Sequence, residues 1–408
     1  MSVESEAAVA PEAVPITSLP RRVWDNLRSG ELGSTPIVVG IVAITLFFYL
    51  KDSTYVGATN FNNLIVQTAG IATIAYGVVF VLLLGEIDLS IGSVSGVAGV
   101  IVAELQLPGS GHQLPGLIAI FLAILAGAVI GGFQGSFVAF LGVPSFVVTL
   151  AGLLAWQGVQ IRALPQSVIT IQNSTINDVA GYYFSHTAGW IIAGVASALY
   201  AFMTLGGVIG RYRAGIVTKN LTLVLFKVLG VAAIAFFVTY KSNTDPGRGV
   251  PFAGVLIIGL LVFWTYIAKR TTFGRHVYAV GGSAEAARRA GINVARIRVI
   301  VFMISGAMAA LGGIVFAARI NGVSLESGHG TELLDAISAA VIGGTSLFGG
   351  RGVVRSALLG AIVISMIANG IDLVPYSPST KLITTGIILL LAVTLDTLSR
   401  RRLEATGR

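Results

Sequence analysis

The feature that most constrains this chain is its series of apolar runs, most of them long enough to cross a lipid bilayer. About 20 residues span the hydrocarbon core as a helix, and a helix satisfies its own backbone hydrogen bonds there. The runs lie at residues 36–50, 63–84, 87–105, 116–141, 145–163, 189–207, 220–240, 251–268, 298–318, 336–348, 355–371 and 381–397. We therefore predict an all-α polytopic membrane protein with roughly 10–12 transmembrane helices. The run at 336–348 is short for a crossing and is a candidate half-helix or re-entrant element.

Composition agrees with this fold class. Charged residues make up 11% of the chain, whereas a soluble domain carries about a quarter. The net charge of +8 could indicate nucleic-acid binding, but the placement of the 26 Lys and Arg residues argues for membrane topology instead. With the N-terminus inside, most of these residues fall in loops on the cytoplasmic side, which is the expected bias.

This topology predicts four parts. Residues 1–30 form a disordered cytoplasmic tail, and residues 36–397 form a transmembrane domain. The loop at 269–298 is the largest cytoplasmic segment of that domain, and residues 398–408 form a basic cytoplasmic tail. Both termini are expected in the cytoplasm.

The loop at 269–298 contains the signals of one short helix. In chain order these are a Gly281–Gly282 turn, Ser283 as N-cap, Glu285 in the first turn, Arg288 and Arg289 in the last turn, and Gly291 as the stop. A helix of about seven residues is too short to be stable alone in water, so it requires a packing partner. The alternative is an ordinary solvated loop between two membrane helices.

Motifs for catalysis are missing from the sequence. No Lys follows a Gly, so there is no Walker A phosphate loop, and neither H-E-x-x-H nor G-x-S-x-G occurs. The chain has no Cys, and its four His are not paired at a ligand spacing, so no metal or other cofactor is expected. We predict a protein that is not an enzyme, and any ATP hydrolysis would belong to another chain.

Polar residues within apolar runs are candidates for a solute pathway, because they are costly in lipid. Glu86 and Asp88 lie between two apolar runs, where they could instead cap the next helix together with Ser90. The amides in apolar runs include Gln67, Gln134, Gln157 and Asn369. They could line a path for a hydroxylated solute or bond across helices. Our predicted pathway set is Glu86, Asp88, Gln134 and Asn369.

Three glycines at 127, 131 and 135 form overlapping G-x-x-x-G steps, and Gly92 and Gly96 form another. Small residues at this spacing let two helix backbones approach closely. We expect these positions to mark close helix packing.

The loop helix also carries a recognisable motif. Glu285-Ala286-Ala287 followed by Gly291 reads as EAA-x3-G, which resembles the loop of ABC importer permeases that docks in a cleft of the ATP-binding subunit. The Ile-x-Leu-Pro that usually follows is missing. Longer stretches at 85–100, 143–158, 273–294 and 334–352 resemble the permeases of monosaccharide ABC importers, the family that imports ribose, galactose, arabinose and xylose.

One insertion narrows the resemblance. Residues 208–251 add a basic inner loop, an extra apolar span and the outer stretch TDPGRGVP. The D-xylose members of the family are similar in this respect, and the shorter ribose members lack the addition. The resemblance therefore implies import of a monosaccharide. D-xylose is the first candidate for the substrate, and ribose, arabinose and galactose are the alternatives.

The family resemblance further implies a bundle of the vitamin B12-importer type in the bacterial plasma membrane. Its implied partners are a second permease copy, an ATP-binding subunit, an extracytoplasmic sugar-binding protein and membrane lipid. The residues implied in coupling to the ATP-binding subunit are Gly282, Glu285, Ala286, Ala287, Arg288, Arg289 and Gly291. A gradient-driven secondary transporter is the rival interpretation. It would favour carboxylates at mid-span, and here the acids cluster at the ends of apolar runs.

Overall fold

The computed structural model describes residues 35–374 except 108–110, 112, 165–166 and 216–220, and scattered positions between 377 and 394. The predicted tails at 1–30 and 398–408 lie outside the described residues, as does most of the apolar run at 381–397. The described chain divides into two compact units, of which one comprises residues 186–240 and the other residues 34–185 and 241–408. We call them the small unit and the large unit.

Long apolar helices dominate the described residues, which confirms the predicted all-α membrane fold. Eight of them are long and apolar enough to cross a membrane. They are α3 (Ala58–Leu83), α5 (Gly116–Phe140), α6 (Ser145–Ala163), α8 (His186–Arg213), α9 (Leu221–Asn243), α10 (Phe252–Arg270), α13 (Val294–Ile320) and α15 (Val354–Leu373).

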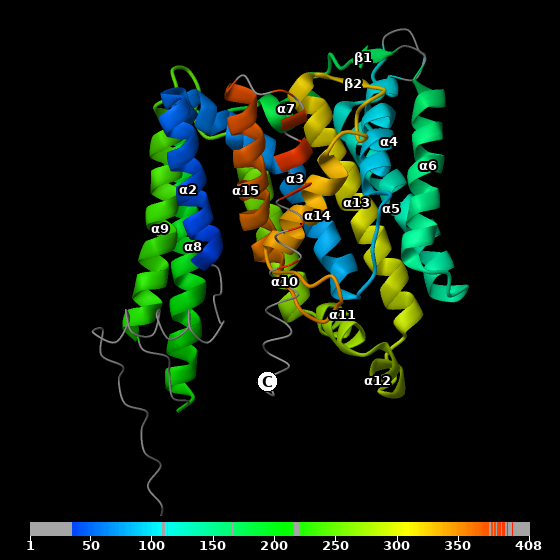
Figure 1. Cartoon of the computed structure of the whole chain (residues 1–408). Helices are drawn as coiled ribbons and strands as arrows, with labels where there is room; N and C mark the ends of the chain where they lie inside the picture. The colour runs from blue at the N-terminus through cyan, green and yellow to red at the C-terminus, as the bar shows by residue number, and fades with distance from the viewer. Residues whose placement is uncertain are drawn as a thin grey trace, which may run out of the picture. The chain divides into compact units, whose positions relative to one another are not determined.

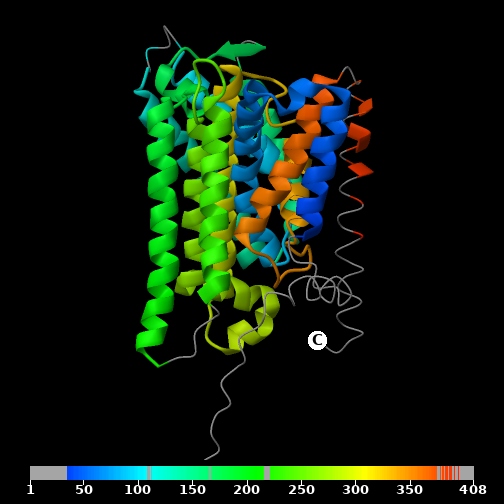
Figure 2. The ribbon, with the colours of Figure 1, turned by 90° about the vertical axis from the view of Figure 1, so that its left-hand side faces the viewer.

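Shorter elements complete the described chain. The short helices are α2 (Thr35–Lys51), η2 (Ser53–Val56), α4 (Ile91–Glu104), α7 (Ser174–Gly181), α11 (Thr272–Gly282), α12 (Ala284–Arg289) and α14 (Glu332–Ile342). Two three-residue strands, β1 (Val168–Thr170) and β2 (Gly322–Ser324), pair antiparallel with Ile169 opposite Val323. Figures 1 and 2 show β1 and β2 at one end of the large unit and α11 and α12 at the other.

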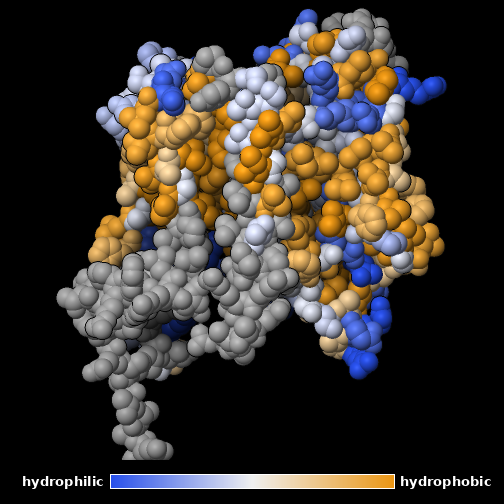
Figure 3. Space-filling view, viewed as in Figure 1, coloured by the Kyte–Doolittle hydropathy of each residue, from blue (hydrophilic) through white to orange (hydrophobic). Residues whose placement is uncertain are grey.

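The large unit is built around α13, which packs against α5, α3 and α4. The predicted glycine steps explain the closest of these contacts. A Cβ on Gly131 would overlap the carbonyl oxygen of Phe302, and Gly127 faces Gly306 backbone to backbone. Apolar side chains left outside this packing are exposed, among them Phe121, Phe133 and Leu154. Figure 3 shows a largely hydrophobic surface over α5 and α6.

Helices α4 and α14, which both lie at predicted apolar runs, are too short to cross a bilayer. For α4 this corrects the expectation of a full span at 87–105, because the helix has 14 residues and measures about 21 Å. Residues 86–90 lie outside any helix or strand and follow Gly85, whose φ is +74°. At the other short helix, α14, the chain leaves helical geometry after Ile342, in agreement with the half-helix expected at 336–348.

The small unit contains α8 and most of α9, which confirms the apolar runs at 189–207 and 220–240 as helices. Trp190 and Phe236 stack with ring centroids 5.9 Å apart. Most other side chains of these helices are exposed, including Phe202 and Met203. Such apolar exposure suits helices that face lipid or another membrane helix.

Candidate functional site

The loop between α10 and α13 forms two helices where the sequence predicted one. The second, α12, has the predicted punctuation. Ser283 Oγ accepts the backbone N–H of Ala286 at 3.2 Å, and Gly291 ends the turn with φ +82°. The N–H of Ile292 reaches back to the carbonyl of Ala287 at 3.0 Å, which completes the C-terminal cap.

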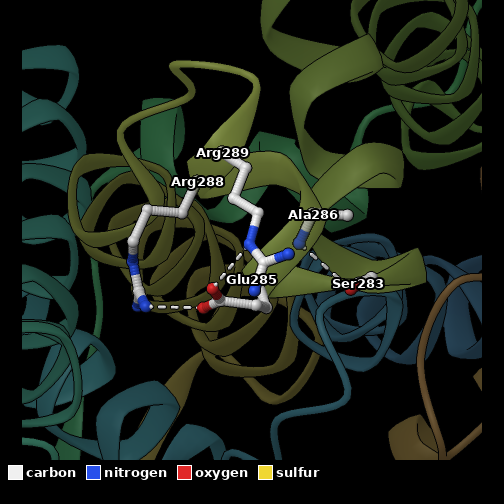
Figure 4. A network of polar contacts seen from close by, with 5 residues as sticks. All are labelled: Ser283, Glu285, Ala286, Arg288 and Arg289. Carbon is white, nitrogen blue, oxygen red and sulfur yellow. Dashed lines mark hydrogen bonds and ion pairs between the residues drawn. The ribbon is translucent and has the colours of Figure 1, made fainter.

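The charged residues of α12 pair with one another. Glu285 accepts from Arg288 at 3.0 Å and from Arg289 at 3.1 Å, as Figure 4 shows. Their side chains are 59%, 66% and 80% exposed, so the pairs contribute little to stability by themselves. Ala287 is the buried residue of this helix. The structure thus holds α12 by small apolar contacts of Ala284 and Ala287 and presents its charges outward.

The first helix, α11, is the element that the sequence reading missed. Thr271 caps its N-terminus by accepting the N–H of Gly274 at 3.1 Å, and Val277 and Val280 are buried. The polar N-cap and these apolar positions were signals that could have revealed it. The predicted turn at Gly281–Gly282 is wrong, because both glycines belong to the last turn of α11. Tertiary packing here outweighs the poor helix propensity of glycine.

That packing joins three distant segments at what we call the glycine junction, made of Leu83, Gly85, Gly281, Gly349 and Gly350. A Cβ on Gly281 would overlap the carbonyl oxygen of Leu83. The same oxygen accepts the N–H of Gly350 at 2.9 Å, and a Cβ on Gly349 would lie 2.9 Å from the nitrogen of Gly85. The end of α11 therefore touches the backbone at the ends of α3 and of the loop before α15.

Two side-chain contacts reinforce the junction. Tyr278 donates its hydroxyl hydrogen to the carbonyl of Gly352 at 2.8 Å, and burial raises the pKa of this phenol. Glu86 forms an ion pair with Arg298 at 3.1 Å, which ties the non-helical segment before α4 to the first turns of α13. Both side chains of this pair are largely shielded, at 14% and 27% exposure.

The other predicted pathway residues lie apart from one another. Asp88 accepts from Ser90 and, at 2.8 Å, from Ser305, so it links α4 to α13. Gln134 on α5 packs beside Gly152 of α6. Asn369 exchanges two amide hydrogen bonds with Asn60, at 2.8 and 2.9 Å. The structure does not bring Glu86, Asp88, Gln134 and Asn369 together, and their pathway role stays a prediction.

A cavity of about 200 Å³ lies elsewhere in the large unit. Residues of α3, α4, α13, α14, α15, β2 and the segment between β2 and α14 line it. Its polar lining includes Gln67, Ser95, Arg319, Ser365 and Asp372. Arg319 and Asp372 come from the C-terminal ends of α13 and α15, so the cavity lies toward the end of the unit away from α12.

Gln67 is among the candidate amides named from the sequence, but it is not in the predicted set. Ser95 and Ser365 are single hydroxyls within apolar runs, and the sequence does not show that they share a space. Within the described part of the chain, no group of three His, Cys, Asp or Glu residues could hold a metal ion.

Comparison with known proteins decides the family. The family model described as "Branched-chain amino acid transport system / permease component" matches residues 60–393, most of the chain. The chain belongs to this permease family. Its described helices, its glycine-packed bundle and its loop with α11 and α12 are therefore those of a transport permease.

Several relatives of this permease are named as permeases of sugar transport systems. It is 36% identical to the xylose transport system permease protein XylH of Escherichia coli (strain K12), over 93% of this chain and 95% of that protein. Identity to the XylH protein of Haemophilus influenzae is 35%, over 93% and 100%. The ribose import permease protein RbsC of Escherichia coli (strain K12) is 31% identical, over 83% and 85%. No solved structure matches the chain.

Proposed function

We propose that this permease is the membrane subunit of an ATP-driven importer of a monosaccharide. D-xylose is the first candidate for its substrate. The observation that carries the proposal is the pair α11–α12. One helix presents exposed charges, and the other is packed against interior backbone at the glycine junction. The names of the XylH and RbsC relatives support a sugar as the solute.

In this proposal the ATP-binding subunit docks on α12 from the cytoplasm. Glu285, Arg288 and Arg289 supply the exposed charges, and Ala286 leaves room for the partner surface. Ala287 anchors the helix to the permease, while Gly291 fixes where it ends. Gly282 is the last, exposed residue of α11, directly before the Ser283 connection.

Movement of α12 on ATP binding would pass to α11, which shares the short Ser283 connection with it. From α11 the movement would reach Leu83 and Gly350 by direct backbone contact, because no flexible side chain separates these groups. The Glu86–Arg298 pair would carry it into α4 and α13. The helices at 252–270 and 294–320, which flank the loop, would tilt with it.

The remaining partners are placed by the same membrane orientation, with α12 on the cytoplasmic side. The permease would work as two copies in the bacterial plasma membrane, surrounded by lipid, with both termini in the cytoplasm. An extracytoplasmic sugar-binding protein would dock at the opposite end, where β1, β2 and α7 lie. The permease itself would hydrolyse no ATP and bind no nucleic acid.

The test is uptake into proteoliposomes that contain the permease, its ATP-binding subunit and the sugar-binding protein. We expect uptake of D-xylose that requires ATP inside and the binding protein outside. Competition by ribose, arabinose and galactose would rank the alternatives. Uptake by the permease alone under a proton or sodium gradient would refute the proposal in favour of secondary transport.

A further inference from the structure

The cavity described above has the polarity of a site for a small neutral solute. One arginine, Arg319, and three carboxylates, on Glu332, Asp335 and Asp372, line it. A sugar hydroxyl can donate to a carboxylate and accept from a guanidinium, so such a lining suits a polyol. The excess of negative charge disfavours sugar phosphates and sugar acids, because like charges at short range repel.

One wall of the cavity is apolar. It includes Ile71 and Phe316, whose ring lies over Gly70 so closely that a Cβ there would come within 2.5 Å of a ring carbon. A pyranose has C–H faces as well as hydroxyl edges, so an apolar wall beside polar groups matches its surface. Ligand pockets commonly combine an apolar lining with a few polar groups in this way.

The hydroxyl of Ser365 is the most informative group in the lining. Ser365 is 1% exposed, and its Oγ has no hydrogen-bond partner among the described residues. A buried polar atom without a partner costs about 1–3 kcal/mol. A ligand hydroxyl in the cavity would remove that cost. Ser95, which also lines the cavity, donates to the Gly92 carbonyl at 2.6 Å and keeps its lone pairs available.

The volume agrees with a ligand of this kind. The cavity has a volume of about 200 Å³. This is the size class of one small sugar ring. Pockets for drug-sized ligands run from about 300 to 1,000 Å³.

From this geometry we infer that the permease has its own binding site for a neutral monosaccharide in this cavity, with Ser365 as a direct hydrogen-bonding group. The inference deepens the proposed function and rests on it for the class of sugar. The site would receive the sugar between its release by the binding protein and its passage toward the α12 end. Its affinity would be weak, because a tight site would retain the solute.

The experiment is a titration of the purified full-chain permease in nanodiscs with free D-xylose, followed by saturation-transfer NMR. We expect binding in the millimolar range and none of D-xylose phosphate. Ser365→Ala should weaken binding about fivefold, the equivalent of about 1 kcal/mol for one hydrogen bond. The matched control is Ser338→Ala on α14, which removes another buried hydroxyl without a described partner, outside the cavity lining.

Two results would overturn the inference. One is no binding of D-xylose by a folded wild-type permease, and the other is equal binding by Ser365→Ala and the wild type. Thermal unfolding of each variant checks that it is folded. The proteoliposome assay separates the two proposals. Transport without direct binding refutes the cavity site alone, and direct binding without ATP-dependent transport refutes the proposed function alone.

Discussion

Substitution of Gly281 by alanine is the sharpest test of the glycine junction, because the neighbouring Gly282 supplies a matched control. Both glycines lie in the last turn of α11. A methyl group on Gly281 would overlap the Leu83 carbonyl oxygen and lie 2.9 Å from the carbonyl carbon, whereas on Gly282 it would meet no described atom within 4 Å. The two variants therefore differ in packing and share the same chemical change.

The magnitude follows from two opposing effects. Alanine is favoured over glycine in a helix by about 0.8–1.0 kcal/mol, and this gain applies equally to both variants. Overpacking costs typically about 1–3 kcal/mol, and here the obstacle is backbone that cannot rotate away. The gain cancels when the two variants are compared. The overlap at Gly281 should therefore lower the coupling free energy by about 1–3 kcal/mol relative to Gly282→Ala, which corresponds to about a 5- to 150-fold change in the coupled equilibrium.

The assay is ATP hydrolysis by the complex in nanodiscs, stimulated by the sugar-loaded binding protein. Gly282→Ala should retain wild-type stimulation and unfold at the same or a higher temperature. Gly281→Ala should lose most of the stimulation while the ATP-binding subunit still co-purifies. If the two variants give equal stimulation and equal unfolding temperature, the junction carries no coupling and the reasoning is wrong.

Three further predictions concern the same end of the permease. Removing the charge in Glu86→Gln and in Arg298→Ala should reduce ATP-coupled uptake. A double-mutant cycle should give an interaction energy of about 0.5–3 kcal/mol between the two residues. Additive effects of the two substitutions would show that the ion pair does not contribute to coupling. Gly291→Leu places a side chain at φ +82°, which costs about 1–2 kcal/mol, so we expect weaker recovery of the ATP-binding subunit by affinity capture; equal recovery would contradict a role for the α12 stop. The raised pKa of Tyr278 means that the folded state disfavours ionisation. The contribution of Tyr278 to the free energy of unfolding is therefore complete below the ordinary pKa of 10.0 and declines as the pH rises above it. Thermal unfolding of the wild type and of Tyr278→Phe as a function of pH would detect this decline. Identical pH dependence in the two proteins would contradict the assignment.

Much of the helical architecture could be predicted from local patterns. The apolar runs predicted the spanning helices because burial in lipid requires length and apolar character, and both are properties of one segment. The same holds for α12. Ser283 and Gly291 act on backbone groups within four residues, so its start and stop were readable without any knowledge of the fold.

Other features required the tertiary structure because their partners are distant in the chain. Gly281 looked like a turn residue, and its contact with Leu83 joins positions far apart in sequence. The short α4 depends likewise on tertiary context, since Asp88 at its start is held by Ser305. In this chain an apolar residue is expected in lipid or in the helix bundle, but its apolar character does not name the neighbour against which it packs.

The cavity shows most clearly the difference between what the sequence determines and what the tertiary structure decides. Polar lining residues such as Gln67, Ser95 and Ser365 lie in apolar helices, where the sequence allows either a bond across helices or a place beside a solute. Asn369 turned out to bond to Asn60, whereas Ser365, four residues earlier on α15, lines the cavity. The sequence by itself determined the membrane fold and the capped, charged helix α12. The tertiary structure decided which polar groups share a space, because only the packing of α3, α4, α13 and α15 sets the distances between them.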